Sequence, residues 1–479
     1  MKKMLSLLLA VAMILCLCAC QSGGTASQKG LQVGYGKANI TPNYSVPLAG
    51  YGNTSQRMSQ GFLDYIYATC IAITDENDST VLLITMDLIG AQTFMVEAMK
   101  TAVTKATGVP ADRIMIQGTH THSGPDVYNS DASITKYRQE YVEKLAQAAA
   151  DAMADRSPAT MQTGTGKTEG LSFVRHYTTS AGDKIYGDNL TLPAGATITG
   201  HVAEPDNEIQ LILFKREAED KKDILAVNWQ CHPKLNSSGE TTEGKQNRPM
   251  ISADYVGAAR DYVESKEDVL FAFYLGAAGN LNANSKIVSE NVSTACKEYG
   301  ALLGDDILEG MKTLKDVEGT TVKTTQQMYG VEIDHSEDHL ASAAQKVSAV
   351  WNSTNNYSQA MEEAKDTEIG SPYHANSIIT RSQNTEGTRK IEINAIRVGP
   401  IGFITAPYEM FDTNGMYIKD NSPFETTFVM TVCNGGNNYI AAKYAFDGGG
   451  SYEVHNRTFP VGTAEALADT YVDMLKSLQ

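Results

Sequence analysis

The chain has 479 residues, of which 42% are hydrophobic, and its formal net charge at pH 7 is -17. A strongly acidic protein repels phosphate backbones, so this charge argues against a nucleic-acid partner and gives no attraction to an anionic membrane surface. The chain is long enough to bury a large core without cross-links, and its four cysteines beyond residue 20 have neither metal-binding nor disulfide spacing.

The first 29 residues carry the features of an exported bacterial lipoprotein. Two lysines precede an apolar run from Leu5 to Leu17, which is too short to cross a bilayer as a stable helix. The run ends in Leu-Cys-Ala-Cys, a pattern typical of lipoprotein cleavage and acylation at its last residue, Cys20. We therefore expect a signal peptide at 1–19, followed by a lipidated Cys20 and a flexible Ser/Gly/Thr/Gln-rich tether at 20–29. The alternative is an ordinary secretory signal with a chance cysteine.

Beyond residue 29, apolar runs of strand length alternate with amphipathic helical patterns. In chain order we expect a strand at Thr80–Met86, a helix at Thr93–Lys105, a strand at Arg113–Gln117, a helix at Ile134–Asp155, strands at Ile209–Phe214 and Ile224–Trp229, a helix at Asp254–Glu264, a strand at Val269–Leu275, a helix at Cys296–Leu314, and strands at Ile391–Val398 and Thr427–Val432. The apolar stripe of Leu467, Tyr471, Met474 and Leu478 predicts a final amphipathic helix.

This alternation predicts an α/β fold with mixed sheets and interleaved helices. The chain shows no linker or repeat that would divide it, so we expect residues 30–479 to form a single large domain. The charged stretch Asp334–Glu368 is expected to be an insertion in that domain.

Two of the nine histidines, His120 and His122, follow directly on the strand expected at Arg113–Gln117. Loops at strand ends often carry active-site groups in α/β proteins, and in extended backbone both rings point to the same side. Alone, the pair could equally well be hydrogen-bonded structural histidines. His232, however, follows the strand at Ile224–Trp229 in the same way. Histidines at two strand ends can converge on one zinc ion, for which imidazole is a common ligand.

These motifs resemble those of the neutral ceramidases, also called non-lysosomal alkaline ceramidases, over most of the chain after residue 29. The matching segments are Val33–Pro42, Leu48–Gly52, Gly118–Pro125, Asn228–Trp229 with His232–Pro233, Ser252–Asp254, Ala406–Glu409, Asn434 with Tyr439–Ile440, and Tyr452–Glu453. The resemblance implies that residues 30–479 are a neutral-ceramidase-like catalytic domain, which cleaves the amide bond of an N-acyl substrate.

The resemblance also implies that His120, His232, Glu409 and Tyr439 are the ligands of a catalytic Zn²⁺. Zinc accepts nitrogen and oxygen donors together, so this set is chemically plausible. Tyrosine is the less usual member, because its phenol needs a nearby cation to ionise near neutral pH. Without the resemblance, Glu409 would be interpreted as a surface acid and Tyr439 as a core aromatic.

Around this metal, the resemblance implies that His122 either supports the metal ligands or handles protons, that Arg175 orients the substrate and that Tyr452 donates to the developing oxyanion. These roles suit amide cleavage, because the carbonyl oxygen gains negative charge and the leaving nitrogen must be protonated. Judged by its local sequence alone, Arg175 is about equally well interpreted as a plain surface arginine.

The segment Gly279–Asn284 departs from the family pattern. Ceramidases have Gly-Asp-Val-Ser-Pro-Asn in this segment, and its serine has been given the role of nucleophile or of substrate-contacting hydroxyl. This chain has Asn282 at the position of that serine. A carboxamide is a poor nucleophile but a capable hydrogen-bonding group, so we expect a zinc-activated water to attack. The resemblance also ends with the catalytic region and does not extend to the extra C-terminal β-domain of the lipid-cleaving members. We therefore expect a ceramide-like or smaller N-acyl amide as substrate.

Together these observations predict a zinc amidohydrolase acting on a small-molecule or lipid N-acyl substrate. The enzyme is expected in the bacterial cell envelope, bound to a membrane through the lipid on Cys20. Two alternatives stay open: a zinc esterase or other hydrolase on the same fold, and a non-catalytic surface-binding lipoprotein. Site chemistry does not separate amide from ester cleavage, because both pass through similar tetrahedral states.

Overall fold

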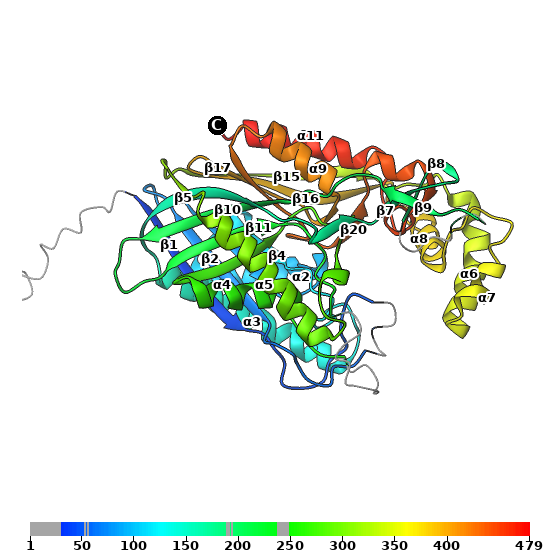
Figure 1. Cartoon of the computed structure of the whole chain (residues 1–479), viewed down its shortest axis with the longest axis horizontal. Helices are drawn as coiled ribbons and strands as arrows, with labels where there is room; N and C mark the ends of the chain where they lie inside the picture. The colour runs from blue at the N-terminus through cyan, green and yellow to red at the C-terminus, as the bar shows by residue number, and fades with distance from the viewer. Residues whose placement is uncertain (1–29, 52–53, 55–56, 188–191, 193–194, 237–248) are drawn as a thin grey trace, which may run out of the picture.

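The computed structural model describes residues 30–51, 54, 57–187, 192, 195–236 and 249–479. The expected signal peptide at 1–19 and the lipidated Cys20 with its tether therefore lie outside the described residues. Two large sheets pack face to face, and helices cover the outer face of each (Figure 1). This arrangement confirms the predicted α/β fold with mixed sheets and interleaved helices.

The larger sheet has the strand order β12-β11-β10-β5-β1-β2-β3-β4, with β14 beside β5. Its strands are β1 (Leu31–Asn39), β2 (Tyr67–Thr74), β3 (Thr80–Met86), β4 (Ile114–Gly118), β5 (Ser157–Lys167), β10 (Glu208–Arg216), β11 (Asp223–Trp229), β12 (Val269–Leu275) and β14 (Lys315–Val317). The pairs β3/β4 and β11/β12 are parallel, because a helical crossover joins their members, and the other pairs are antiparallel.

Four helices cover the outer face of this sheet. The helices α2 (Thr93–Thr107) and α3 (Ala132–Ala154) pack on β1 to β4, and α4 (Asp254–Lys266) and α5 (Val292–Met311) pack on β5 and β10 to β12. The close approach of α3 to β1 depends on glycine, since a Cβ at Gly36 would lie 1.9 Å from the carbonyl oxygen of Ala148.

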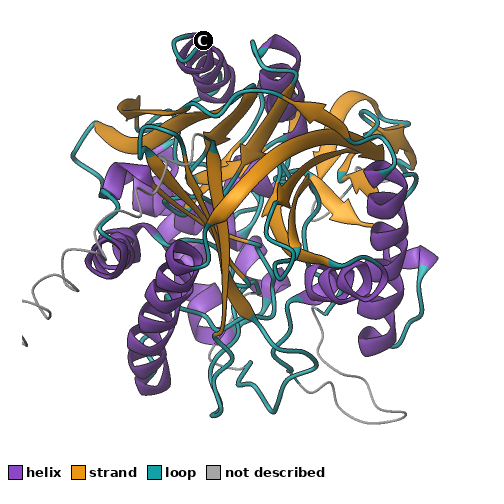
Figure 2. Cartoon of the chain, turned by 90° about the vertical axis from the view of Figure 1, so that its left-hand side faces the viewer, coloured by secondary structure: helices purple, strands orange, loops and turns teal. Residues whose placement is uncertain are grey.

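The second sheet has the order β15-β16-β17-β19. Its strands are β15 (Val322–Glu332), β16 (Thr388–Val398), β17 (Ile401–Thr405) and β19 (Thr426–Met430). The inner faces of the two sheets share one core, in which Val33 and Ile71 lie with Phe403. On the outer face lie α9 (Asp412–Asn421) and α11 (Thr463–Lys476), so the strands occupy the centre of the molecule (Figure 2). The apolar stripe predicted for the last helix packs here.

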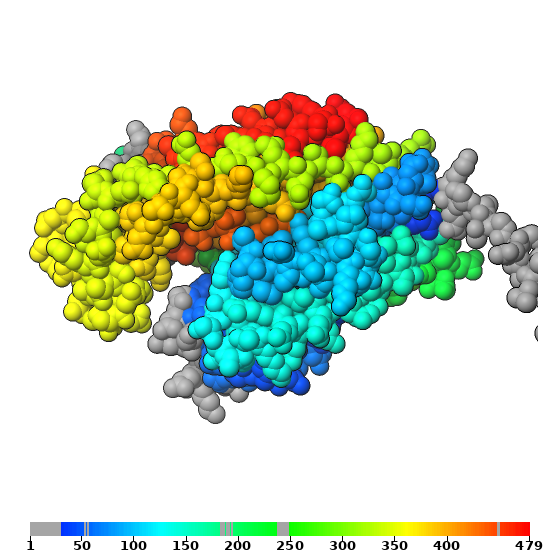
Figure 3. All heavy atoms as spheres, turned by 180° about the vertical axis from the view of Figure 1, so that it is seen from behind, coloured from blue at the N-terminus to red at the C-terminus, as the bar shows by residue number. Residues whose placement is uncertain are grey.

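A helical excursion interrupts the hairpin of β15 and β16. These strands pair from Val322 with Val398 to Glu332 with Thr388, so residues 333–387 leave and return at one end of the hairpin. The excursion contains η4 (Asp338–Leu340), α6 (Ala341–Thr354), α7 (Tyr357–Glu362) and α8 (Pro372–Ser382), and it has a small apolar core of its own. It stands out as a lobe at one end of the molecule (Figure 3). The stretch expected as an insertion, Asp334–Glu368, thus forms most of this excursion.

Shorter elements gather at the same end of the molecule as the excursion (Figure 1). They are β6 (Ser172–Val174), β7 (His176–Thr179), β8 (Gly182–Gly187), β9 (Ile198–His201), β13 (Leu281–Ala283), β18 (Tyr408–Met410), β20 (Asn437–Ile440), β21 (Gly448–Gly450), α10 (Tyr452–His455) and the single turns η3 (Ser285–Ile287) and η5 (Lys443–Phe446). A further single turn, η2 (Ala111–Arg113), directly precedes β4. No helix among the described residues is long and apolar enough to cross a membrane.

Candidate metal centre and active site

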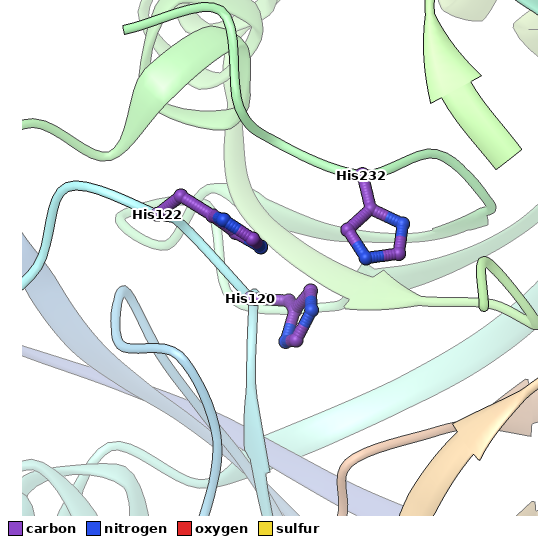
Figure 4. A group of neighbouring side chains, drawn as sticks. All are labelled: His120, His122 and His232. Atoms are coloured by element: carbon purple, nitrogen blue, oxygen red, sulfur yellow. The ribbon is translucent and has the colours of Figure 1, made fainter. Parts of the chain in front are cut away.

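His120, His122 and His232 converge at the end of the large sheet (Figure 4). Their ring centroids lie 4.8 to 5.5 Å apart, and one ring nitrogen of each lies within 4.8 Å of the others. The strand ends meet because the sheet curls until its edges approach. Gln117 of β4 donates hydrogen bonds to the carbonyl oxygens of Leu275 in β12, at 2.8 Å, and of Thr431 after β19, at 2.7 Å.

A main-chain carbonyl orients each of the three rings. Nδ1 lies 2.7 Å from the Ile89 oxygen in His120, 3.0 Å from the Gly50 oxygen in His122, and 2.8 Å from the Ala278 oxygen in His232. A carbonyl oxygen only accepts, so Nδ1 carries the hydrogen in a neutral ring and Nε2 keeps its lone pair. Metal-binding histidines are held in this way.

The other ring nitrogens supply an independent test of whether a metal fits. Nε2 of His122 is buried and has no hydrogen-bond partner among the described residues, and Nε2 of His120 is buried with only the Glu409 carboxylate beside it, at 3.3 Å and poorly aligned for a hydrogen bond. A buried polar atom without a partner is unfavourable, and a cation between the rings would satisfy both. The donor set therefore fits a bound metal ion.

Glu409 and Tyr439 add oxygen donors next to the histidine nitrogens. Glu409 lies in β18 opposite Tyr439 of the parallel strand β20. The Oε2 atom of Glu409 lies 3.3 Å from Nε2 of His120 and 3.1 Å from Nε2 of His232. The Tyr439 hydroxyl lies 3.5 Å from Nε2 of His232. The structure thus brings together all four residues that the sequence assigned to the metal.

Burial decides the protonation of these groups. It lowers the pKa of His232 to about 4 and holds the pKa of His122 well below 6.5, so both imidazoles are neutral at pH 7. It also raises the pKa of the Tyr439 phenol well above 10. Neutral imidazole is the form that binds a metal, whereas the phenol needs a cation beside it to ionise.

Arg175 is buried beside the candidate ligands, so it is not a surface arginine. Its Nη2 atom lies 3.2 Å from the Tyr439 hydroxyl, and its Nη1 atom lies 3.3 Å from Oδ1 of Asn282. Its Nε atom lies 2.6 Å from the carboxylate of Glu453. This ion pair holds the guanidinium, which stays positively charged, and Arg175 has contacts on several sides.

Asn282 and Tyr452 also lie at the site. Asn282 is buried in β13, beside His232 in an isolated parallel bridge. Tyr452 begins α10, and its ring centroid lies 5.8 Å from that of Tyr439 in an edge-to-face contact. Burial raises the pKa of Tyr452 to about 12, so its hydroxyl stays protonated and can donate a hydrogen bond. The site residues expected from the sequence are thus all within one region.

Two cavities open onto this region. One, of about 410 Å³, is lined by His122, Arg175, Tyr439 and Tyr452 among others. The second, of about 800 Å³, shares Tyr51 and Lys234 with the first and extends past Asn282. A substrate therefore has room on both sides of a bond held at the histidines.

Comparison with known proteins agrees with this geometry. Residues 31–306, more than half of the chain, match the family model for the N-terminal part of neutral/alkaline non-lysosomal ceramidase. The chain belongs to the neutral/alkaline non-lysosomal ceramidase family. Ceramidases are hydrolases, so membership of this family indicates that the protein is a hydrolase. A search of curated proteins found no significant match.

Solved ceramidase structures resemble the fold of this ceramidase-family protein. It resembles the crystal structure of neutral ceramidase from Pseudomonas aeruginosa with a TM-score of 0.67 and 16% identity, covering 94% of this chain and 75% of that one. A ceramidase complexed with C2 gives the same values. At this identity the likeness shows the fold alone.

The sequence did not predict a buried network of polar side chains that contacts Arg175. The carboxylate of Glu453 contacts Nε of Arg175 and lies 3.0 Å from Nε2 of His176, whose Nδ1 lies 3.0 Å from the Tyr444 hydroxyl. Two of these residues adjoin residues that the sequence did single out, because His176 follows Arg175 and Glu453 follows Tyr452. That adjacency was the available signal.

Cys231, next to His232, does not contribute to the candidate centre. Its Sγ atom lies 3.8 Å from the Tyr299 hydroxyl, within the apolar cluster that holds Trp229 and Tyr255. Burial raises the pKa of this thiol to about 12, so it is not a thiolate at neutral pH.

Proposed function

We propose that this ceramidase-family protein is a zinc-dependent amidohydrolase that cleaves the amide bond of a ceramide-like or smaller N-acyl substrate. One observation carries the proposal: three histidine rings each offer a nitrogen within 4.8 Å of the others, and the Glu409 carboxylate and the Tyr439 hydroxyl lie within 3.5 Å of Nε2 of His232 beside an open cavity. Family membership supports hydrolysis, and the similar structure of a ceramidase complexed with C2 supports an N-acyl lipid type of substrate.

His120, His232, Glu409 and Tyr439 are the proposed zinc ligands, and their nitrogen and oxygen donors suit this metal. Zinc, when bound, polarises a carbonyl oxygen and lowers the pKa of a coordinated water. The carbonyls at Nδ1 fix the tautomer and the orientation of the two ligand imidazoles before any metal arrives.

The remaining residues handle the proton and the charge. His122 has a neutral ring with Nε2 facing the site, so it can accept a proton from the attacking water and return one to the leaving nitrogen. Tyr452 donates its hydroxyl hydrogen toward the carbonyl oxygen as charge develops there. Arg175 holds Asn282 and Tyr439 in place and contributes positive charge beside them.

A second candidate role for His122 is that of a third histidine ligand, because one of its ring nitrogens belongs to the same close group as those of His120 and His232. The two roles predict different results for His122→Ala. If His122 handles protons, the variant keeps its zinc and loses turnover. If it is a ligand, zinc is lost as well.

The test is to measure zinc content and hydrolysis for the purified protein, using N-acyl amides of varied chain length and matched esters. His120→Ala and His232→Ala should lose most of the metal and nearly all activity. His339→Ala, which removes an exposed histidine on η4, is the matched control and should keep both. Full zinc occupancy in both site variants would overturn the ligand assignment. Cleavage of esters without amides would overturn the amidohydrolase assignment.

A further inference from the structure

The helical excursion forms one wall of the cavity beside the histidines. Tyr357 of α7, Ser371 before α8 and Tyr373 of α8 all line this cavity of about 410 Å³, together with His122 and Tyr439. Residues 333–387 lie outside the part of the chain that matches the family model, which ends at residue 306. The excursion thus adds a surface of its own to a site whose histidines come from the matched part.

Aromatic contacts connect this wall to the candidate metal centre. The ring centroid of Tyr452 lies 5.8 Å from that of Tyr439 and 5.9 Å from that of Tyr373. Tyr373 in turn lies 6.0 Å from Trp351 of the excursion core. All three contacts are edge-to-face, the arrangement that aromatic pairs favour. Tyr373 is therefore fixed between the site and the body of the excursion.

The residue after Tyr373 anchors α8 against α10. The His374 ring stacks on the His455 ring, with centroids 4.3 Å apart and planes inclined by only 2°. Nε2 of His374 donates to the Glu337 carboxylate at 3.1 Å, which also accepts from Arg457 and Arg381. These buried contacts hold the wall rigid, as a specificity-determining surface requires.

The chemistry of the wall selects what it can hold. Five tyrosines line the cavity, namely Tyr51, Tyr357, Tyr373, Tyr439 and Tyr452, and the described lining residues include no aliphatic side chain. The hydroxyls of Tyr51, Tyr357 and Tyr439 have partners within the protein. A long hydrocarbon would take the hydroxyls of Tyr373 and Tyr452 from water without giving them a partner. A compact ring that carries hydroxyls can stack on the phenol faces and hydrogen-bond to their tips.

The second cavity has a mixed lining. It includes Lys234, Lys286 and Asn284, but it also has the aliphatic side chains that the described lining of the first cavity lacks. Phe173, Ile198, Leu235 and Ala283 contribute apolar surface to this cavity of about 800 Å³. It meets the first where Arg175 contacts Asn282. A fatty acyl chain is hydrocarbon, so the apolar part of this cavity suits it better than the tyrosine-lined cavity does, and the tyrosine-lined cavity is left for the amine half of the substrate.

We propose that Tyr357 and Tyr373 form a subsite for the amine half of the substrate, and that this amine is a compact aromatic or hydroxylated ring rather than a long alkyl chain. The inference rests on the proposed amidase function, because it assigns the two halves of an N-acyl amide to the two cavities. Tyr357 and Tyr373 contact the substrate and determine its specificity, whereas His374 and His455 position them.

The experiment uses three octanoyl amides with the same acyl group, formed with tyramine, glucosamine and octylamine. We expect kcat/KM to be about tenfold or more higher for the two ring amines than for octylamine. Tyr373→Ala should reduce that ratio about tenfold, mainly through KM, and Tyr357→Ala should reduce it less because Tyr357 is more exposed. Tyr417→Ala, an exposed tyrosine on α9, is the control and should leave the ratio unchanged.

Calorimetric binding of tyramine, glucosamine and octylamine to the same proteins gives a readout without turnover. Ring amines should bind more tightly than octylamine in the wild type, and this preference should shrink in Tyr373→Ala. Two results would overturn the inference: a wild-type preference for octylamine, or an unchanged preference in both variants while zinc content and thermal melting are normal. If no amide is cleaved, the proposed function is wrong. The relative affinities of the three amines still test whether the subsite exists.

Discussion

Main-chain carbonyls determine the orientation of the histidines at the scale of single residues. Gly50 provides one of these carbonyls and has a φ of +97°, which favours glycine. A Cβ at this position would lie 2.5 Å from the His122 ring, so any other residue would displace the imidazole. The Gly-Tyr turn that the sequence shares with the ceramidases thus has a physical role beside the candidate centre.

Replacement of Asn282 tests whether the amide side chain takes part in the reaction. Asn282→Ala removes a buried hydrogen-bonding group beside Arg175 but no metal ligand. Turnover should fall by about a hundredfold to a thousandfold, the loss typical of one oxyanion donor, while zinc content stays unchanged. Steady-state kinetics with metal analysis measures both, and Asn421→Ala on the exposed end of α9 should behave as wild type.

The identity of Asn282 also predicts that no acyl-enzyme forms, because a carboxamide supplies no oxygen nucleophile. Rapid quench and mass spectrometry with a good substrate should find the protein unmodified at every time point. The nearby hydroxyl of Ser285 is exposed in η3, and an acyl group trapped there or on any other side chain would contradict this mechanism.

The sequence identifies some of these residues better than others. His120, His122 and His232 are predicted from it because each follows a recognisable strand, and the strands carry them to one place. The burial of Arg175 is not predictable locally, because its partner Tyr439 lies 264 residues further along the chain. A contact of that range exists only once the tertiary fold has formed.

At the scale of elements, strands whose side chains are all buried were predictable from the sequence. The strands at Thr80–Met86 and Val269–Leu275 have the predicted bounds, because nearly every side chain in them is apolar and buried. The strand β15 was missed, since most of its Thr, Gln and Lys side chains face solvent and give no apolar run. The helix predicted from Cys296 begins at Val292, because the Asn291 side chain accepts a hydrogen bond from the Thr294 amide and caps it.

The attachment of α8 leads to a prediction about acid stability. Burial opposes ionisation of Glu337, but the His374 hydrogen bond and the Arg457 charge outweigh it and hold the carboxyl pKa well below its usual range. A carboxyl with a lowered pKa stabilises the fold above the ordinary value of about 4, and this contribution is lost as the pH falls through the lower folded value.

Glu337→Gln should therefore reduce the free energy of unfolding by about 2 kcal/mol at pH 7, less than for a fully buried pair because the carboxylate keeps some contact with water. Below pH 4 the difference from wild type should shrink. Thermal melting from pH 7 to pH 3 measures this, with Glu362→Gln in an exposed pair with Lys365 as the control. A difference that grows in acid would contradict the assignment.

At the scale of the whole molecule, we propose that lipid on Cys20 anchors the catalytic body to a membrane of the cell envelope. The proposal rests on the apolar run and the Leu-Cys-Ala-Cys ending in the sequence. The wild-type protein should fractionate with membranes and have an acylated N-terminal peptide, and Cys20→Ala should be released or mislocalised. Cys18→Ala is the matched control, and an unmodified mature N-terminus by intact-mass analysis would refute the anchor.

The candidate metal centre lies between the two sheets of the molecule. His120 and His232 follow strands β4 and β11 of the large sheet, whereas Glu409 and Tyr439 lie in β18 and β20, next to the second sheet. A metal held by all four residues therefore links the two halves of the fold, and its removal should loosen both together.

Chelation should lower the thermal stability of the whole protein and not of one loop only. A ligand present at a hundredfold its dissociation constant stabilises the folded state by about 2.7 kcal/mol, so loss of zinc should lower the melting temperature by a few degrees. Amide hydrogen exchange should rise together in residues 118–125 and 406–410, which carry ligands from the two sides. His120→Ala should not respond to the chelator, and His339→Ala should respond as wild type does. An unchanged melting temperature after verified loss of zinc would show that the metal does not join the two sheets.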